Sequence, residues 1–383
     1  MTVAAVAWNS SDRPRPSPRR PPAARTGDGR GPTTVTGAVG SPVNPLAIKQ
    51  LRPRGPLIMR FATFAHDGRA RSGVVTDATT VRPLPEGTTV LELVRRGLSG
   101  LLDAGKQATG PEIPLAQVRL LPPLQPPTVR DFVAFEEHVE GVVRSVSGTT
   151  GVVDEWYAAP TFYFSNPHTL IGAHDDVAVP PGCALLDFEL EVAAVIGREG
   201  RTLDTAAAHD AIIGYTIFND WSARDLQRAE MRVGLGPAKG KDFASTLGPW
   251  LVTADEFVDR HDPDGFLPLE MTVAVNEKTI GQDLLSNMGW PFAELVAYAS
   301  RGSVVRPGDV LGSGTCGNGG CLAELWGRTG SQQPPALRPG DVVSMTVEGI
   351  GTIRNQVVAA EADAFDIAPA RFRPRTRHTA NSS

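Results

Sequence analysis

Cysteine is scarce in this sequence, since only Cys183, Cys316 and Cys321 occur among 383 residues. An odd number of scattered cysteines in so long a chain argues against a disulfide framework and favours a reducing compartment. Long hydrophobic runs are missing too, because no apolar stretch reaches the roughly 18–20 residues that cross a bilayer. The formal net charge of −5 gives no reason to expect a nucleic-acid or anionic-membrane partner. We therefore expect a cytoplasmic protein.

Two nucleotide-binding signatures are also absent. No Gly-x-Gly-x-x-Gly follows the first strand-like segment, and the sequence contains no Walker-type loop. Strand-like segments are many, helix-like segments are few, and the two do not alternate as in a doubly wound fold. Two Arg-Pro-Gly-Asp-Val repeats, at 306–310 and 338–342, read as turns that lead into strands. This pattern predicts a strand-rich α+β fold with a curled sheet or barrel-like roll.

Residues 1–58 differ from the rest of the chain. They are rich in Pro, Arg, Gly, Ser and Thr, and they show neither helical nor strand periodicity. This composition predicts a disordered tail, and the lack of a compact apolar segment argues against a secretory signal. Two interpretations stay open: Met59 is the natural start of the protein, or the upstream segment is a basic regulatory tail. Residues 373–383 are polar, and we expect them to be disordered as well.

Two folded domains are expected between these tails. Residues 59–125 form a small β-rich N-terminal domain, with a predicted hairpin at its start, a helix near 89–96 and a Pro-rich linker at 121–127. Residues 126–372 form the larger domain. Its predicted helices cover about 134–146, 222–231 and 292–300, and its predicted strands cover 161–165, 184–196, 212–219, 269–275, 342–347 and 351–358.

An acidic pair lies within one of these predicted strands. Glu189 and Glu191 are followed by the apolar run Val192–Ile196, which indicates a buried strand. Side chains alternate along a strand, so both carboxylates should point to one side. A hard divalent cation would relieve their mutual repulsion. The alternative is the solvent-facing side of an edge strand.

A second polar group follows the predicted strand 212–219. Asp220 lies where this strand is expected to become a helix, and its carboxylate is a candidate helix cap. Arg224 and Gln227 follow at the fourth and seventh positions, so they share a helical face with it. One face thus offers an acid, a fixed cation and an amide. An ordinary cap with an Asp–Arg pair is the alternative interpretation.

These motifs resemble those of a known family. The run Asn219-Asp220-Trp221-Ser222-Ala223-Arg224-Asp225-Leu226-Gln227 is similar to the signature of the fumarylacetoacetate hydrolase superfamily, and Asp187-Phe188-Glu189-Leu190-Glu191 resembles its metal-binding strand. Gly240-Lys241-Asp242-Phe243 resembles its lysine loop, and segments 311–315 and 322–325 resemble its closing loops. The resemblance covers about residues 130–358. It implies a mixed β-roll catalytic domain and a homodimer.

The resemblance also implies a role for each matching residue. The metal ligands would be Glu189, Glu191 and Asp220, with Mg²⁺, Mn²⁺ or Ca²⁺ as the ion. The groups around the developing oxyanion or the substrate carboxylate would be Arg224, Gln227 and Lys241. The acid–base pair that activates water would be His138 and Glu324. Contacts with the substrate would come from Tyr163 and Thr315.

Two departures from the family pattern affect these assignments. Ala134 occupies the place where fumarylacetoacetase has a fourth carboxylate, so only three protein carboxylates are expected. Relatives often carry a lid carboxylate three residues after the histidine, but here Gly141 follows His138 at that spacing. Glu137 and Glu140 are the nearby alternatives.

Other interpretations of single residues stay open. Apart from the resemblance, His138 reads as a partly exposed polar residue on a helix, and Lys241 reads as part of a surface loop. Cys316 and Cys321 flank four residues of a glycine-rich loop. A thiol nucleophile or a zinc pair is conceivable, but two cysteines alone do not make a zinc site. We expect small residues in a tight loop.

The main hypothesis for function is hydrolysis of a carbon–carbon bond in a β-diketo acid, such as an acylpyruvate or fumarylacetoacetate, through a metal-bound enolate. A second hypothesis keeps the site and changes the chemistry to decarboxylation, tautomerisation, isomerisation or hydration of 2-oxo-dioates. A third is a non-catalytic binding protein on the same fold. The predicted partner is a small oxo acid in each enzymatic case.

Overall fold

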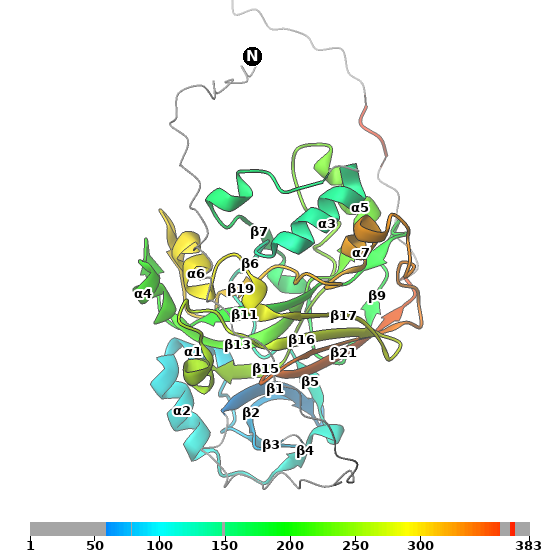
Figure 1. Ribbon diagram of the computed structural model, residues 1–383. Helices are drawn as coiled ribbons and strands as arrows, with labels where there is room; N and C mark the ends of the chain where they lie inside the picture. The colour runs from blue at the N-terminus through cyan, green and yellow to red at the C-terminus, as the bar shows by residue number, and fades with distance from the viewer. Residues whose placement is uncertain (1–58, 78, 148–149, 361–367, 372–383) are drawn as a thin grey trace, which may run out of the picture. The chain divides into compact units, whose positions relative to one another are not determined.

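The computed structural model describes residues 59–77, 79–147, 150–360 and 368–371. The tails predicted at 1–58 and 373–383 lie outside the described residues. The described part is strand-rich α+β, as predicted, and its sheets are open (Figure 1). No helix within it has the length and apolar character that a membrane crossing requires.

The N-terminal region begins with the predicted hairpin. Strands β1 (Arg60–His66) and β2 (Arg69–Val75) pair antiparallel around Asp67 and Gly68, whose φ angles of 50° and 72° suit a tight two-residue turn. Helix α1 (Val90–Arg95) begins with a capping box between Thr89 and Glu92, which satisfies its first amide groups. The remaining elements of this region are β3 (Thr80–Pro83), α2 (Gly97–Gln107), β4 (Ile113–Pro114) and β5 (Arg119–Leu121).

One large sheet joins this region to the rest of the protein. Strand β1 pairs antiparallel with β15 (Ser245–Thr253), so the N-terminal strands continue a sheet formed mainly by residues after 128. From β15 the sheet continues in this order: β13 (Ile212–Asn219), β11 (Leu190–Ile196), β19 (Val310–Gly312), β6 (Val129–Phe132) and β7 (Phe162–Ser165). Strands β11, β19 and β6, which are far apart in the sequence, therefore lie side by side in the sheet.

A second, five-stranded sheet packs against the central strands β11, β13 and β15. Apolar side chains of the two sheets, such as Ile217, Met271 and Ile353, belong to one buried core. The strands of this sheet, in order, are β17 (Lys278–Leu284), β16 (Glu270–Val275), β20 (Val342–Val347), β21 (Gly351–Val358) and β9 (Val177–Ala178). Helices α4 (Thr205–His209) and α6 (Phe292–Ser300) pack on each other beside the sheets.

The strand predicted at 184–196 is interrupted, contrary to expectation. Strand β10 (Leu186–Asp187) ends at Asp187, and β11 starts at Leu190. The interruption has a local cause, because the amide of Glu189 donates to the side-chain oxygen of Asn219 at 3.0 Å instead of to a strand neighbour. The backbone therefore bends at the first of the two expected metal-ligating glutamates.

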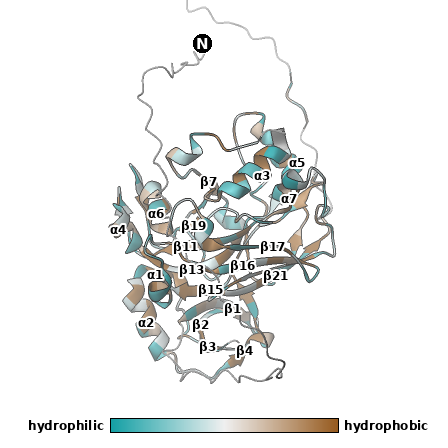
Figure 2. Cartoon of the chain, viewed as in Figure 1, coloured by the Kyte–Doolittle hydropathy of each residue, from teal (hydrophilic) through white to brown (hydrophobic). Residues whose placement is uncertain are grey.

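Helices α3 (Glu136–Ser147) and α7 (Leu322–Thr329) pack closely above the sheet (Figure 1). Helix α3 carries both hydrophilic and hydrophobic residues, as expected of a helix with one packed face (Figure 2). A Cβ at Gly141 would lie 2.5 Å from Glu324 Cγ, and one at Gly327 would lie 1.9 Å from the Gly141 carbonyl oxygen. The lid carboxylate expected near this position therefore has no room at residue 141.

Candidate active site

Three buried carboxylates converge where β6, β10 and β11 meet. Asp131 comes from β6, Glu189 from the bend after β10, and Glu191 from β11, and one ligand oxygen of each lies within 4.8 Å of the others. None of the three residues is more than 4% exposed. The two glutamates lie on the same side of the chain, as strand alternation predicted. Asp131 was not among the residues that the sequence singled out.

Strand pairing explains how this cluster forms. Gly312 of β19 is the Cα partner of Asp131 on one side and of Ala193 in β11 on the other. A Cβ at Gly312 would lie 2.6 Å from Asp131 Oδ1 and 2.9 Å from Glu191 Oε2. The absence of a side chain at this residue therefore leaves the space in which the two carboxylates approach each other.

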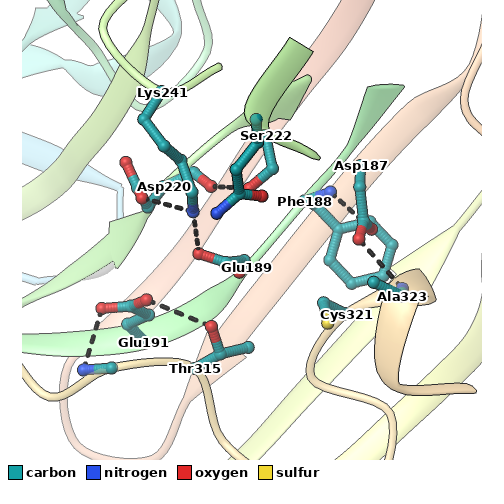
Figure 3. A network of polar contacts seen from close by, with 12 residues as sticks. Asp187, Phe188, Glu189, Glu191, Asp220, Ser222, Lys241, Thr315, Cys321 and Ala323 are labelled. Atoms are coloured by element: carbon teal, nitrogen blue, oxygen red, sulfur yellow. Dashed lines mark hydrogen bonds and ion pairs between the residues drawn. The ribbon is translucent and has the colours of Figure 1, made fainter. Parts of the chain in front are cut away.

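Asp220 joins the cluster through Lys241. The Lys241 ammonium contacts Glu189 Oε2 and lies 2.6 Å from Asp220 Oδ2, and the lysine is 3% exposed (Figure 3). Asp220 also accepts hydrogen bonds from Ser245 Oγ at 3.1 Å and from the Tyr163 hydroxyl. Lys241 is thus a buried site residue and not part of a surface loop.

Arg224 links the cluster to its surroundings. Its Nη2 lies 2.7 Å from Glu189 Oε1, its Nε lies 2.8 Å from Asp187 Oδ2, and its Nη1 donates to Gln227 Oε1 at 3.1 Å. Helix α5 (Arg224–Met231) begins only at Arg224 and has no side-chain cap. The expected cap by Asp220 and the Asp220–Arg224 pair are therefore wrong, because Asp220 is held by Lys241 and Arg224 by Asp187 and Glu189.

Asp187 has a structural role that the sequence did not reveal. Its fully buried carboxylate accepts from the amides of Leu322 and Ala323, at 2.8 and 3.0 Å, while it pairs with Arg224 (Figure 3). These amides belong to the first turn of α7, which favours a negative charge. Asp187 therefore fixes the start of α7, the helix that carries Glu324, relative to Arg224.

The electrostatics of the carboxylates favour a bound cation. Burial, followed by the nearby charge of Asp220, raises the pKa of Asp131 to about 7. Burial and Asp131 likewise raise the pKa of Glu191 well above its usual range. Burial alone would raise the pKa of Glu189 too, but Lys241 and Arg224 hold it below its ordinary value. Lys241 and Arg224 do not offset all of this negative charge, since the pKa values of Asp131 and Glu191 stay raised, and a further cation would favour their ionised forms.

The donor set fits a hard divalent ion. All donors are carboxylate oxygens, which Mg²⁺, Mn²⁺ and Ca²⁺ prefer. Asp131 Oδ1 is buried and has no hydrogen-bond partner among the described residues, as a ligand oxygen would in the absence of an ion. Asp131 is a further buried carboxylate beside the three that the resemblance implied as ligands. Its position is set by the pairing of β6 with β19, which no local motif reveals.

Replacing Gly312 with Ala should weaken divalent-cation binding. The added methyl group would push Asp131 and Glu191 apart, and overpacking of this kind costs about 1–3 kcal/mol of stability. Calorimetric titration with Mn²⁺ measures the affinity. Gly110→Ala is the control, since its added Cβ would meet its nearest neighbour at an ordinary 3.4 Å. Unchanged affinity in the Gly312 variant would argue against a cation between these two carboxylates.

His138 and Glu324 lie on the packed faces of α3 and α7. His138 is 7% exposed, and its Nδ1 lies 3.7 Å from Cys321 Sγ. Glu324 accepts from the amide of Gly319 at 3.2 Å and from Arg328 Nη1 at 3.0 Å. These contacts do not join the histidine to the glutamate, so the two members of the expected acid–base pair are not directly hydrogen-bonded.

The two residues nevertheless have opposite pKa shifts. Burial lowers the pKa of His138 to about 4 and raises that of Glu324 to about 7, against the opposing pull of Arg328. At neutral pH the histidine is therefore neutral and can accept a proton, while a large share of Glu324 carries one. Environments that separate two titratable groups in this way are typical of acid–base sites.

Thr315 and Glu191 complete the contacts of the site. Thr315 Oγ1 lies 3.4 Å from Glu191 Oε1, and the Gly314 amide donates to Glu191 Oε2 at 3.1 Å (Figure 3). Every residue that the sequence singled out for the site is thus linked by these contacts or by the packing of α3 on α7.

Cys316 and Cys321 are both buried, and neither forms a disulfide.

Comparison with known proteins adds to this geometry. Residues 128–358 match the family described as fumarylacetoacetate (FAA) hydrolase C-terminal, and residues 59–123 match a domain described as Rv2993c-like, N-terminal. The first match spans more than half of the chain. It contains the carboxylates, Lys241, Arg224, His138 and Glu324.

Individual relatives are distant but cover long stretches. The fumarylacetoacetase of Arabidopsis thaliana is 28% identical over 61% of this chain and 66% of its own length, just under two thirds. The mitochondrial oxaloacetate tautomerase of Rattus norvegicus is 29% identical over 73% of this chain and 80% of its own. The solved fumarylacetoacetate hydrolase of Exiguobacterium antarcticum is 27% identical, with a TM-score of 0.60 over 79% of this chain and 99% of that one.

Proposed function

This chain belongs to the fumarylacetoacetate hydrolase family, and we propose that it hydrolyses a carbon–carbon bond in a β-diketo acid of the acylpyruvate or fumarylacetoacetate type. The observation that carries the proposal is the buried carboxylate cluster of Asp131, Glu189 and Glu191 with His138 next to Glu189, supported by the opposite pKa shifts of His138 and Glu324. Hydrolysis needs one group that takes a proton from water and another that gives a proton to the departing carbon.

The cation would be held by Asp131, Glu189, Glu191 and Asp220. A divalent ion there would polarise the substrate carbonyls and stabilise negative charge on their oxygens. Arg224 and Lys241 supply fixed positive charge at the edge of the same centre, where the carboxylate of a 2-oxo acid would bind. The Gln227 amide lies beside the Arg224 guanidinium and would help to orient that carboxylate.

Proton transfer falls to the two helices above the centre. Neutral His138 would take a proton from water as its oxygen attacks the carbonyl carbon farther from the substrate carboxylate. The carbon–carbon bond then breaks, and its electron pair stays on the 2-oxo acid fragment. Protonated Glu324 would return a proton to that carbon. Glu324 packs on Gly141, which follows His138 by one turn of α3, so both groups belong to one face of the site.

Tautomerisation of a 2-oxo-dioate is the second candidate. One observation favours it: His138 and Glu324 are not hydrogen-bonded to each other, and a tautomerase needs no activated water. The rat relative, an oxaloacetate tautomerase, is consistent with such chemistry on this scaffold. In that case a single proton carrier at the site suffices.

A turnover screen distinguishes the candidates. The protein, supplemented with Mg²⁺ or Mn²⁺, would be offered acylpyruvates, oxaloacetate and unsaturated 2-oxo-dioates, with products identified by mass spectrometry. We expect two fragments from an acylpyruvate. Faster exchange between keto and enol forms of oxaloacetate without cleavage, followed by the ultraviolet absorbance of the enol because the two forms have the same mass, would support the tautomerase instead. Absence of any turnover across the panel would favour a binding protein on the same fold.

Glu324 should give the reaction an alkaline limit. Its pKa is raised to about 7, so the protonated form is lost as the pH rises through that value, and the rate should fall with it. Glu324→Gln should lower the rate and remove this limb from the pH–rate profile. The exposed Glu294, replaced in the same way, serves as the control. If the rate of the Glu324 variant still fell over the same pH range as in the wild type, the proton donor would be another group.

A further inference from the structure

A second group of metal-ligating atoms adjoins the carboxylate centre. His138, Cys321 and Glu189 each offer one ligand atom, and these atoms lie within 4.8 Å of one another. The Sγ of Cys321 lies 3.7 Å from His138 Nδ1. Figure 3 shows Cys321 beside Glu189, on the side away from Glu191 and Thr315. This group is a nitrogen, an oxygen and a sulfur, whereas the first centre is formed by oxygens alone.

Three separate elements fix these donors. His138 lies in α3, Cys321 is the N-cap of α7, and Glu189 lies at the bend before β11. Each residue is at least nine-tenths buried, at 7%, 0% and 4% exposure. Within the described part of the chain, the one polar contact of the His138 ring is to the Cys321 sulfur. A neutral imidazole nitrogen is a common metal ligand.

The surrounding charges suit a cation. Asp187 and Glu189 are the carboxylates that act on Cys321 most closely, with Glu324 beyond them, and Arg224 is the positive group among them. When a metal binds, the thiol proton is released to the buffer and a thiolate takes its place. The two close carboxylates and the thiolate then outweigh the Arg224 guanidinium and the Lys241 ammonium, which also contacts Glu189, and a divalent ion offsets the remaining negative charge.

We propose that His138, Cys321 and Glu189 form a second cation site that selects thiophilic ions such as Zn²⁺ and Cd²⁺. A mixed sulfur, nitrogen and oxygen donor set is one that zinc favours, whereas Mg²⁺ and Ca²⁺ take oxygen ligands. A consequence rests on the proposed function: an ion in this site occupies the His138 nitrogen and blocks proton transfer. Zinc should therefore inhibit an enzyme whose first centre already holds magnesium.

Cadmium absorbance tests the site without requiring turnover. The full-length protein would be saturated with Mg²⁺ and titrated with Cd²⁺, while the ultraviolet charge-transfer band of cadmium thiolate is recorded. The wild type should develop the band to saturation, and excess Zn²⁺ should remove it. Cys321→Ser should lose the band, although serine still caps α7 at the Glu324 amide. Cys316→Ser, which removes the other buried thiol of the same loop, should keep it.

Several results would overturn the proposal: no band in the wild type, an equal band in Cys321→Ser, or loss of the band in Cys316→Ser alone. Anomalous scattering from cadmium-soaked wild-type crystals tests the geometry without a substitution. A peak between Cys321 Sγ and His138 Nδ1 is expected, and a peak only among the carboxylates contradicts the site. A band that is present while zinc leaves turnover unaffected would reject the proposed role of His138 but not the site.

Discussion

Replacing His138 with Ala should lower the turnover number by roughly 10²–10⁴-fold, the usual loss when a general acid or base is removed. His138 is buried on α3, and its pKa is lowered to about 4. It is not one of the carboxylates proposed to bind the metal ion. Affinity for Mg²⁺ should therefore stay near the wild-type value. Steady-state kinetics on a cleaved acylpyruvate, with calorimetric titration of Mg²⁺, measure both quantities.

The exposed His209, replaced in the same way, is the control for this experiment. A small effect of His138→Ala on turnover would indicate chemistry that needs no activated water, as in tautomerisation. A large loss of Mg²⁺ affinity would instead place the histidine among the metal ligands. If no assay showed any effect, the base would have to be sought among Glu137, Glu140 and Glu324.

Replacing Glu191 with Gln should reduce divalent-cation affinity while a part of the activity returns at high metal concentration. The amide keeps the size of the side chain but removes a negative charge from a buried centre whose carboxylates need a cation. Glu191 also accepts hydrogen bonds from Gly314 and Thr315, so the amide oxygen can retain one of these contacts. The metal dependence of the rate shows the effect as a shift to higher concentration.

Glu294→Gln, on the exposed side of α6, controls for the same change of charge elsewhere. Activity of the Glu191 variant that does not respond to added metal would mean that the carboxylate acts directly in catalysis. Unchanged metal affinity would remove Glu191 from the centre. In contrast with His138→Ala, the main effect here should be on binding and not on the maximal rate.

Short-range patterns in the sequence predicted much of this site. Alternation along a strand placed Glu189 and Glu191 on one side, and the motif around Asp220 and Arg224 identified residues that the structure brings together. The hairpin at the start of the folded region followed from the turn residues Asp67 and Gly68. Each of these inferences depends on residues within about ten positions of one another, where local geometry determines the outcome.

Pairing between distant segments could not be predicted in this way. Asp131 reaches the cluster only because β6 pairs with β19 and β19 with β11. Nothing in the neighbouring sequence distinguishes Asp131 from other acids of the chain. Helix α7 was missed because its eight residues are few and its N-cap is a cysteine, while Asp187 from a distant strand accepts from its first amides. These interactions exist only once the chain has folded.

Strand β15 was missed because the sequence contains a proline within it. A Gly-Pro pair is typical of turns, yet Ser245–Thr253, which contains Gly248 and Pro249, is a nearly continuous buried strand between β1 and β13. The pairing of β15 with β13 shifts register between Tyr215 and Ile217, opposite this proline. Proline is tolerated in a central strand at such an irregularity, since its missing N–H is not needed there.

Hydrolysis in ¹⁸O-labelled water tests the central claim most directly. The Mg²⁺-loaded protein would be incubated with an acylpyruvate in labelled water, and both products would be analysed by mass spectrometry. Cleavage by activated water places one labelled oxygen in the carboxylate of the released acid, while the pyruvate fragment gains only a hydrogen. We expect this pattern in the wild type and its near absence in His138→Ala. Consumption or isomerisation of the substrate without cleavage and without labelled acid would contradict the account.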